Sequence, residues 1–149
     1  MISAKVLVRV VAVIYALFCI VCLAFVWAIA SSTSAAHIPR KPFIGAASAI
    51  PGISMWAIGC FVLSVLSLRF LKLGRAWRIT TLAGSLLMSL RVIWVSASLS
   101  AESAPFYMAL GQEGRVPLAI LLGTYSSLAL VFSICPLLLW SQLRASASN

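Results

Sequence analysis

The side chains with the most reactive chemistry in this sequence are its four cysteines, Cys19, Cys22, Cys60 and Cys135. Cys19 and Cys22 form a C-x-x-C pair, a spacing at which redox enzymes activate one of two neighbouring thiols. All four cysteines lie inside apolar runs rather than in polar connections. Because a buried cysteine behaves as a small hydrophobic residue, packing is the favoured interpretation of all four.

A thiol–quinone redox enzyme is the function that the cysteines would support if they were reactive. Four-helix membrane thiol oxidoreductases also carry four cysteines and an arginine, but their reactive pairs lie at or beyond the membrane surface, where a substrate reaches them. Neither long polar connection of this chain contains a cysteine. The redox enzyme is therefore a distant third hypothesis.

Other residue patterns of catalysis or metal binding are not found in the sequence. His37 is the single histidine, which is too few to complete a zinc site or to ligate a haem on both faces. The two acids, Glu102 and Glu113, both lie in one polar connection, and there is no glycine-rich phosphate loop. We therefore expect no catalytic residue, no metal and no cofactor, and a function that is not enzymatic.

Arg91 is the only charged residue deep inside an apolar run. An arginine at the centre of a bilayer costs about 2.5–3.5 kcal/mol on insertion scales, and no acid lies inside any apolar run. Two interpretations stay open: a structural clamp bonded to hydroxyls and carbonyls, or a fixed cation that awaits an anionic group. The candidate ligand-binding residues, placed by their expected depth or by the face of the helix, are Arg91, Ser98, Tyr125, Ser126 and Ser127.

The composition indicates which environment must position these residues. Hydrophobic residues make up 63% of the 149 residues and charged residues 9%, and the mean hydropathy is +1.13. Soluble domains are roughly 45–50% apolar and about 25% charged. The net charge of +9 comes from basic residues at the ends of apolar runs, where they anchor helices against anionic headgroups. The lipid bilayer is thus the expected partner, and nucleic acid is not.

Four apolar runs predict an all-α integral membrane protein, a four-helix bundle forming one membrane domain over residues 1–149. We expect helices at about 8–30, 52–71, 77–100 and 116–142. A cleaved signal peptide competes for the first run, but its length favours a retained helix. The short turn Lys72–Arg75 predicts that the second and third runs form an antiparallel hairpin. Polar connections are expected at 31–52 and 100–115, the latter with Pro105, Gly111 and Gly114 as breakers.

Orientation follows from the distribution of basic residues, which favours the cytoplasmic side. Three basic residues fall on one side of the predicted bundle, and seven fall on the side of the two termini. The three are Arg40, Lys41 and Arg115, and the seven are Lys5, Arg9, Arg69, Lys72, Arg75, Arg78 and Arg144. The sequence therefore predicts a multi-pass protein of the cell membrane with both termini in the cytoplasm.

Small residues on the third run predict close helix packing. Serines recur at three- and four-residue spacing, the pattern that lets another backbone approach closely in lipid. On the fourth run, Pro136 should bend the helix and free the carbonyl of Phe132. The predicted helix-packing residues of the third run are Gly84, Ser85, Ser89, Ser96 and Ser100.

These observations favour a function through association. The protein would be an accessory subunit, a scaffold or an inhibitory partner of a membrane complex, with a homo- or hetero-oligomeric membrane partner. The alternative is a carrier or binding protein for an anionic or lipid-like ligand, in which Arg91 is the intramembrane counter-ion.

Overall fold

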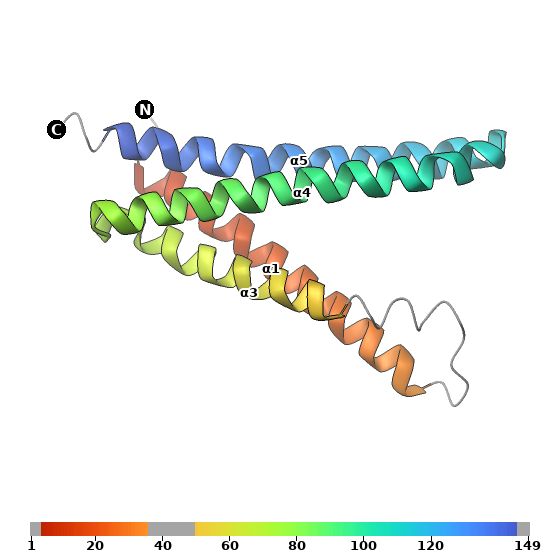
Figure 1. The fold of residues 1–149 in the computed structure, drawn as a ribbon, viewed down its shortest axis with the longest axis horizontal. Helices are drawn as coiled ribbons and strands as arrows, with labels where there is room; N and C mark the ends of the chain where they lie inside the picture. The colour runs from red at the N-terminus through yellow and green to blue at the C-terminus, as the bar shows by residue number, and fades with distance from the viewer. Residues whose placement is uncertain (1–3, 36–49, 146–149) are drawn as a thin grey trace. The chain divides into compact units, whose positions relative to one another are not determined.

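The computed structural model describes residues 4–35 and 50–145, which form four long helices and one short 3₁₀ turn (Figure 1). Helix α1 spans Ala4–Ala35, α3 spans Ile50–Arg69, α4 spans Arg75–Ala109 and α5 spans Gln112–Ala145. The 3₁₀ turn η1, Phe70–Lys72, follows α3 directly. The prediction of an all-helical chain with four long apolar helices is confirmed.

Each of the four helices is long and apolar enough to cross a membrane. Helix α3 has 20 residues, whereas α1, α4 and α5 have 32, 35 and 34. About 20 residues are enough to cross a hydrocarbon core of about 30 Å. The three longer helices therefore exceed that thickness, and a membrane would hold only part of each, or hold it tilted.

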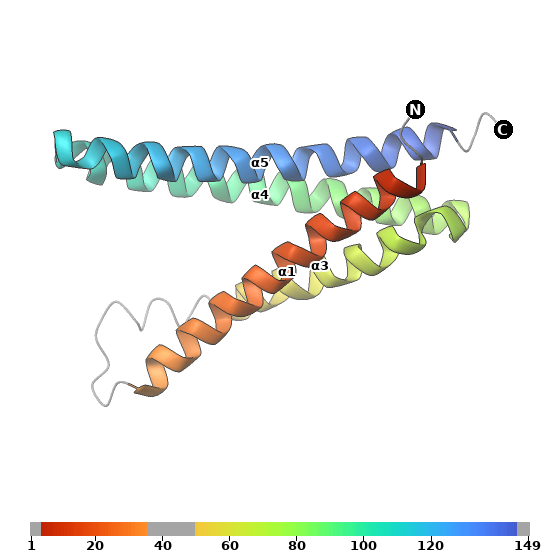
Figure 2. The same cartoon turned by 180° about the vertical axis from the view of Figure 1, so that it is seen from behind.

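The chain divides into two compact units, Met1–Leu73 and Gly74–Asn149. Helices α1 and α3 pack against each other in the first unit, and α4 and α5 pack against each other in the second (Figures 1 and 2). Each unit is thus a pair of antiparallel helices. The single bundle, and the hairpin between the second and third apolar runs, cross the boundary between the units and stay predictions.

The first hairpin packs through aromatic, thiol and aliphatic side chains. Ser64 of α3 donates a hydrogen bond of 2.9 Å to the carbonyl of Ala12 on α1, and the rings of Phe18 and Trp56 lie 6.2 Å apart. The buried positions on α1 follow a spacing of three or four residues, as expected for one face of a helix. They are Val8, Val11, Ala12, Tyr15, Cys19 and Cys22, and α3 buries Ala57, Cys60, Leu63, Ser64 and Ser67.

The second hairpin is longer than the sequence predicted. Helix α4 continues nine residues past the expected end at 100, through Pro105, and α5 begins at Gln112 instead of 116. A proline removes one backbone hydrogen bond, but here it does not end the helix. The turn lies at Leu110 and Gly111, and Gly111 has φ +63, a left-handed conformation that favours glycine.

The polar connection that contains His37, Arg40 and Lys41 lies outside the described residues, apart from its first five and last three positions.

Candidate functional site

The register between α4 and α5 sets the depth of every candidate residue on these two helices. Ser89 of α4 donates a hydrogen bond to the carbonyl of Phe132 on α5. Near the turn, Gly114 of α5 lies against the backbone of Tyr107 on α4. The residue numbers in both pairs add to 221. A residue of α4 and a residue of α5 therefore lie level with each other when their numbers add to 221.

The small residues of α4 form the face that is buried in the structure. Ser85, Ser89 and Ser96 are buried together with Val92, while Ser100 is half-buried. Gly84 is also half-buried, but at 100° per residue it lies beside this stripe rather than on it. The structure thus brings four of the five predicted packing residues onto one face of the helix.

Ser89 and Pro136 form a matched pair across this interface. In an uninterrupted helix the carbonyl of Phe132 accepts the backbone N–H of residue 136, and a proline has no N–H to donate. The Ser89 hydroxyl donates to that carbonyl, and it also lies 2.9 Å from the carbonyl of Ser85. The Ser89 hydroxyl on α4 therefore replaces the backbone N–H donor that is missing at Pro136.

Arg91 does not belong to the interface between α4 and α5. It is exposed, and it lies about 120° around the helix axis from the middle of the buried serine stripe. Its neighbours one turn away, Leu87 and Trp94, are 68% and 67% exposed. Among the residues that the structure describes, Arg91 has no hydrogen bond or ion pair.

Arg91 lies near the middle of α4. It lies 16 residues after Arg75 and 18 before Ala109, so it is about 27 Å from the Ala109 end of the helix. It lies 13 residues after Arg78, which places it about 20 Å beyond the basic turn. Arg91 therefore lies within the apolar part of α4, far from both helix ends.

The other candidate ligand residues are not gathered around Arg91. By the register, Leu130 is the residue of α5 level with Arg91, whereas Tyr125 lies level with Ser96. Tyr125 is half-buried, while Ser126 and Ser127 are exposed on other sides of the helix. Ser98 shares the side of α4 that carries Arg91, two turns further along, and is half-buried. The ligand-binding role of these residues stays a prediction.

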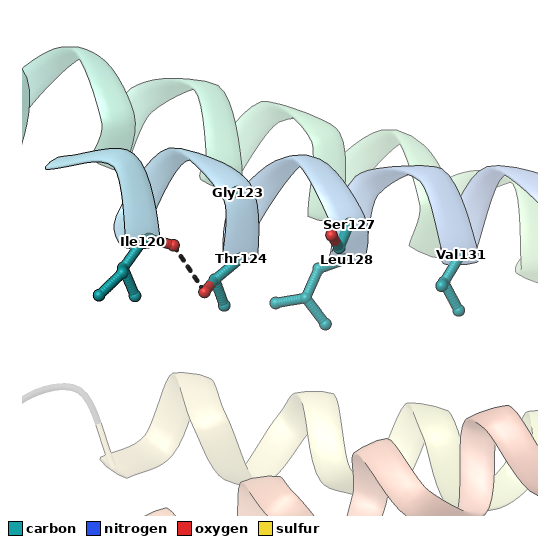
Figure 3. Close-up of a pocket in the computed structure, with 6 residues that line it drawn as sticks. All are labelled: Ile120, Gly123, Thr124, Ser127, Leu128 and Val131. Carbon is teal, nitrogen blue, oxygen red and sulfur yellow. Dashed lines mark hydrogen bonds between the residues drawn. The ribbon is translucent and has the colours of Figure 1, made fainter. Parts of the chain in front are cut away.

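A shallow hollow of about 530 Å³ lies along one side of α5 (Figure 3). The side chains of Ile120, Thr124, Leu128 and Val131 project to the same side of the helix. Thr124 donates a 2.8 Å hydrogen bond to the carbonyl of Ile120 in its own helix. Neither Arg91 nor Tyr125 lines this hollow. Its lining residues are Ile120, Gly123, Thr124, Ser127, Leu128 and Val131.

Gly114 is a packing residue whose role the sequence did not reveal, because it was interpreted only as a helix breaker. It is buried in the first turn of α5. A Cβ atom at this position would overlap the carbonyl oxygen of Tyr107 and would lie 3.0 Å from the Cβ of Leu110. The end of the hairpin thus depends on a backbone contact that only glycine allows.

The cysteines take packing positions in the helices. Cys19, Cys22, Cys60 and Cys135 are all buried thiols, and Cys60 and Cys135 have no exposed surface. Within the described ranges, no cluster of three or more His, Cys, Asp or Glu side chains could hold a metal ion. Arg91 is therefore the feature of the described helices that most needs a functional explanation.

Together, the four apolar helices are candidate membrane spans, and they indicate a multi-pass membrane protein. No family model, no curated protein and no solved structure matches the chain.

Proposed function

We propose that this protein acts by association within the membrane, as an accessory subunit, scaffold or inhibitory partner of a larger complex. Arg91 carries the proposal, because an ionisable residue inside a transmembrane helix usually pairs with another group or faces a polar cavity. Arg91 points away from α5 and has no bond to any described residue. A partner that covers this side of α4 would offset the cost of placing the arginine in lipid.

The proposed arrangement is a four-helix bundle in the cell membrane with both termini in the cytoplasm. The excess of basic residues near the termini and around the Lys72–Arg75 turn supports this orientation. Tags at the two termini of the chain should then be protected from a protease that is added outside intact cells. They should be digested only after the cell membrane has been permeabilised. Digestion of either tag from outside intact cells would contradict the orientation.

Site-specific photo-crosslinking in native membranes tests the association. A photoreactive residue at position 87 lies one turn from Arg91 on the same side of α4, and one at position 93 lies about 160° around the helix. Both positions are exposed, at 68% for Leu87 and 40% for Ile93. We expect position 87 to form a discrete protein adduct and position 93 to form none. Adducts with lipid alone at both positions would overturn the proposal.

A further inference from the structure

The chain supplies no carboxylate that can neutralise Arg91. Its two acids are Glu102 and Glu113. Glu102 lies 11 residues further along α4, about 16 Å away along the axis. Glu113 lies level with Met108 by the register of the hairpin, about 25 Å along the axis from Arg91. The first hairpin contributes neither Asp nor Glu, so a carboxylate at this depth must come from another molecule.

A second copy of the chain does not provide that carboxylate either. Copies inserted in the same orientation place Arg91 at the same depth as its counterpart, and their glutamates stay at the same distances along the membrane normal. Two arginines facing each other in a low dielectric repel strongly. The charge of Arg91 therefore disfavours this side of α4 as a contact between copies.

The surroundings of Arg91 suit a helix rather than a soluble partner. Leu87 and Trp94 lie one turn before and after Arg91 and are the two most exposed large apolar side chains of α4. Large apolar side chains on both sides of a guanidinium would pack against an apolar helix while the guanidinium donates two parallel hydrogen bonds to a carboxylate. Such a pair is much stronger in the bilayer than in water, because the dielectric constant is low.

We propose that the partner is a transmembrane helix of a different protein that carries one Asp or Glu at the depth of Arg91. This inference rests on the proposed association and specifies its chemistry. The arginine and the acid would each be costly in lipid alone, and each offsets the cost of the other when the helices pair. The partner is thus recognised by its charge as well as by its shape.

Synthetic transmembrane helices test the proposal directly. The probes are two Leu/Ala peptides that differ only in a central Asp or Asn, inserted into phosphatidylcholine vesicles with the full-length protein. Energy transfer between labels measures the association. We expect the Asp peptide to bind about tenfold more tightly than the Asn peptide, which corresponds to about 1.4 kcal/mol. Equal binding of both peptides would overturn the inference.

Variants of the protein complete this experiment. Arg91→Gln should abolish the preference for Asp, whereas Arg91→Lys should retain part of it because the charge remains. Arg115→Gln is the matched control, because Arg115 is an exposed arginine in the first turn of α5, and it should leave the preference unchanged. An Asp preference that persists in Arg91→Gln would overturn the inference. An Asp preference that vanishes when phosphatidylglycerol is added would also overturn it, because a lipid phosphate then neutralises Arg91.

The failure of this inference can be told apart from the failure of the proposed association. If the native partner is still crosslinked from position 87 in the Arg91→Gln variant, association stands and the charge pairing is wrong. If wild-type protein yields no protein adduct from position 87, the association itself is wrong, whatever the peptides do.

Discussion

The two hairpins of this protein bring their helices together with different side chains. The first buries large and polarisable groups, including the ring of Tyr15 and the thiols of Cys19 and Cys60. The second buries hydroxyl-bearing residues along α4, and on α5 it buries a glycine at the start of the helix together with Phe132, Cys135 and Leu139. In a membrane, where lipid is as apolar as the protein, small residues gain stability by letting backbones approach. The buried face of α1 instead carries mostly larger side chains, such as Val8, Val11 and Tyr15.

The two hairpins should therefore tolerate different substitutions. An added methyl group in the second hairpin meets backbone atoms, as the surroundings of Gly114 show. Removal of the Ser89 hydroxyl takes a hydrogen-bond donor from the carbonyl of Phe132. Pro136 has no N–H to replace that donor. In the first hairpin the Ser64 hydroxyl donates to the carbonyl of Ala12, and residue 16, an alanine, still has a backbone N–H for that carbonyl.

The largest effect is expected for Gly114→Ala. The new methyl group would overlap the carbonyl of Tyr107, and the backbone must move to relieve the clash. Such overpacking costs typically 1–3 kcal/mol, and we expect about 3 kcal/mol here because the opposing atoms are backbone. Unfolding in detergent micelles by increasing denaturing detergent, followed by circular dichroism, measures the loss.

Gly123→Ala is the matched control for this substitution. Gly123 also lies in α5, and a Cβ atom there meets nothing within 4 Å. Alanine favours the helix over glycine by about 1 kcal/mol, so this variant should be as stable as wild type or more so. Equal losses at the two glycines would show that the close approach at Gly114 is not what stabilises the hairpin.

An intermediate effect is expected for Ser89→Ala. The substitution removes the hydroxyl that donates to the carbonyl of Phe132, and we expect a loss of about 1–2 kcal/mol in the same unfolding assay. Pro136→Ala returns a backbone N–H to that carbonyl. In the Pro136→Ala background, Ser89→Ala should therefore cost much less, and a double-mutant cycle measures the coupling. Strict additivity would contradict the pairing of Ser89 with Pro136.

A smaller effect is expected for Ser64→Ala in the first hairpin. The carbonyl of Ala12 loses a 2.9 Å hydrogen bond from Ser64 but lies in an uninterrupted helix. Interhelical hydrogen bonds in membranes average about 0.6 kcal/mol, and we expect a loss of that size. If Ser64→Ala destabilises the protein as much as Ser89→Ala, the two hairpins do not differ in the way described.

The smallest effect on function is expected for the double substitution Cys19→Ser and Cys22→Ser. Both thiols are buried on the α1 face of the first hairpin, where they pack as small hydrophobic groups. The yield of the crosslinked adduct from position 87 should stay within about twofold of wild type, as expected for sites outside the interface. Loss of an electron-transfer activity in this variant would instead support the redox hypothesis.

Hydrophobicity alone was sufficient to predict the four helices, because each run had enough apolar residues to cross a bilayer. The ends of α4 and α5 could not be predicted in this way. Pro105 and Gly114 are breakers by type, yet neither ends a helix, and only Gly111 has the left-handed conformation of a turn. A single lost hydrogen bond at a proline does not outweigh the packing of the turns around it.

The misplaced ends of α4 and α5 also gave the wrong neighbours for Arg91. If α4 ended at 100 and α5 began at 116, residues whose numbers add to 216 would lie level, and Arg91 would lie level with Tyr125. The observed contacts add to 221, which places Leu130 at the level of Arg91. A shift of five residues is about 7.5 Å along a helix. The unusual residue could thus be identified from the sequence, but its neighbours could not.

Native mass spectrometry of the protein in lipid nanodiscs tests whether Arg91 holds a different protein in a complex. The wild-type protein is taken from its own membrane without harsh detergent. Its mass should then equal the 15.9 kDa of the chain plus the mass of one different protein. The Arg91→Gln variant should appear at the mass of the chain alone. Identical complexes for the two proteins, or a wild-type protein at 15.9 kDa without a partner, would contradict association through Arg91.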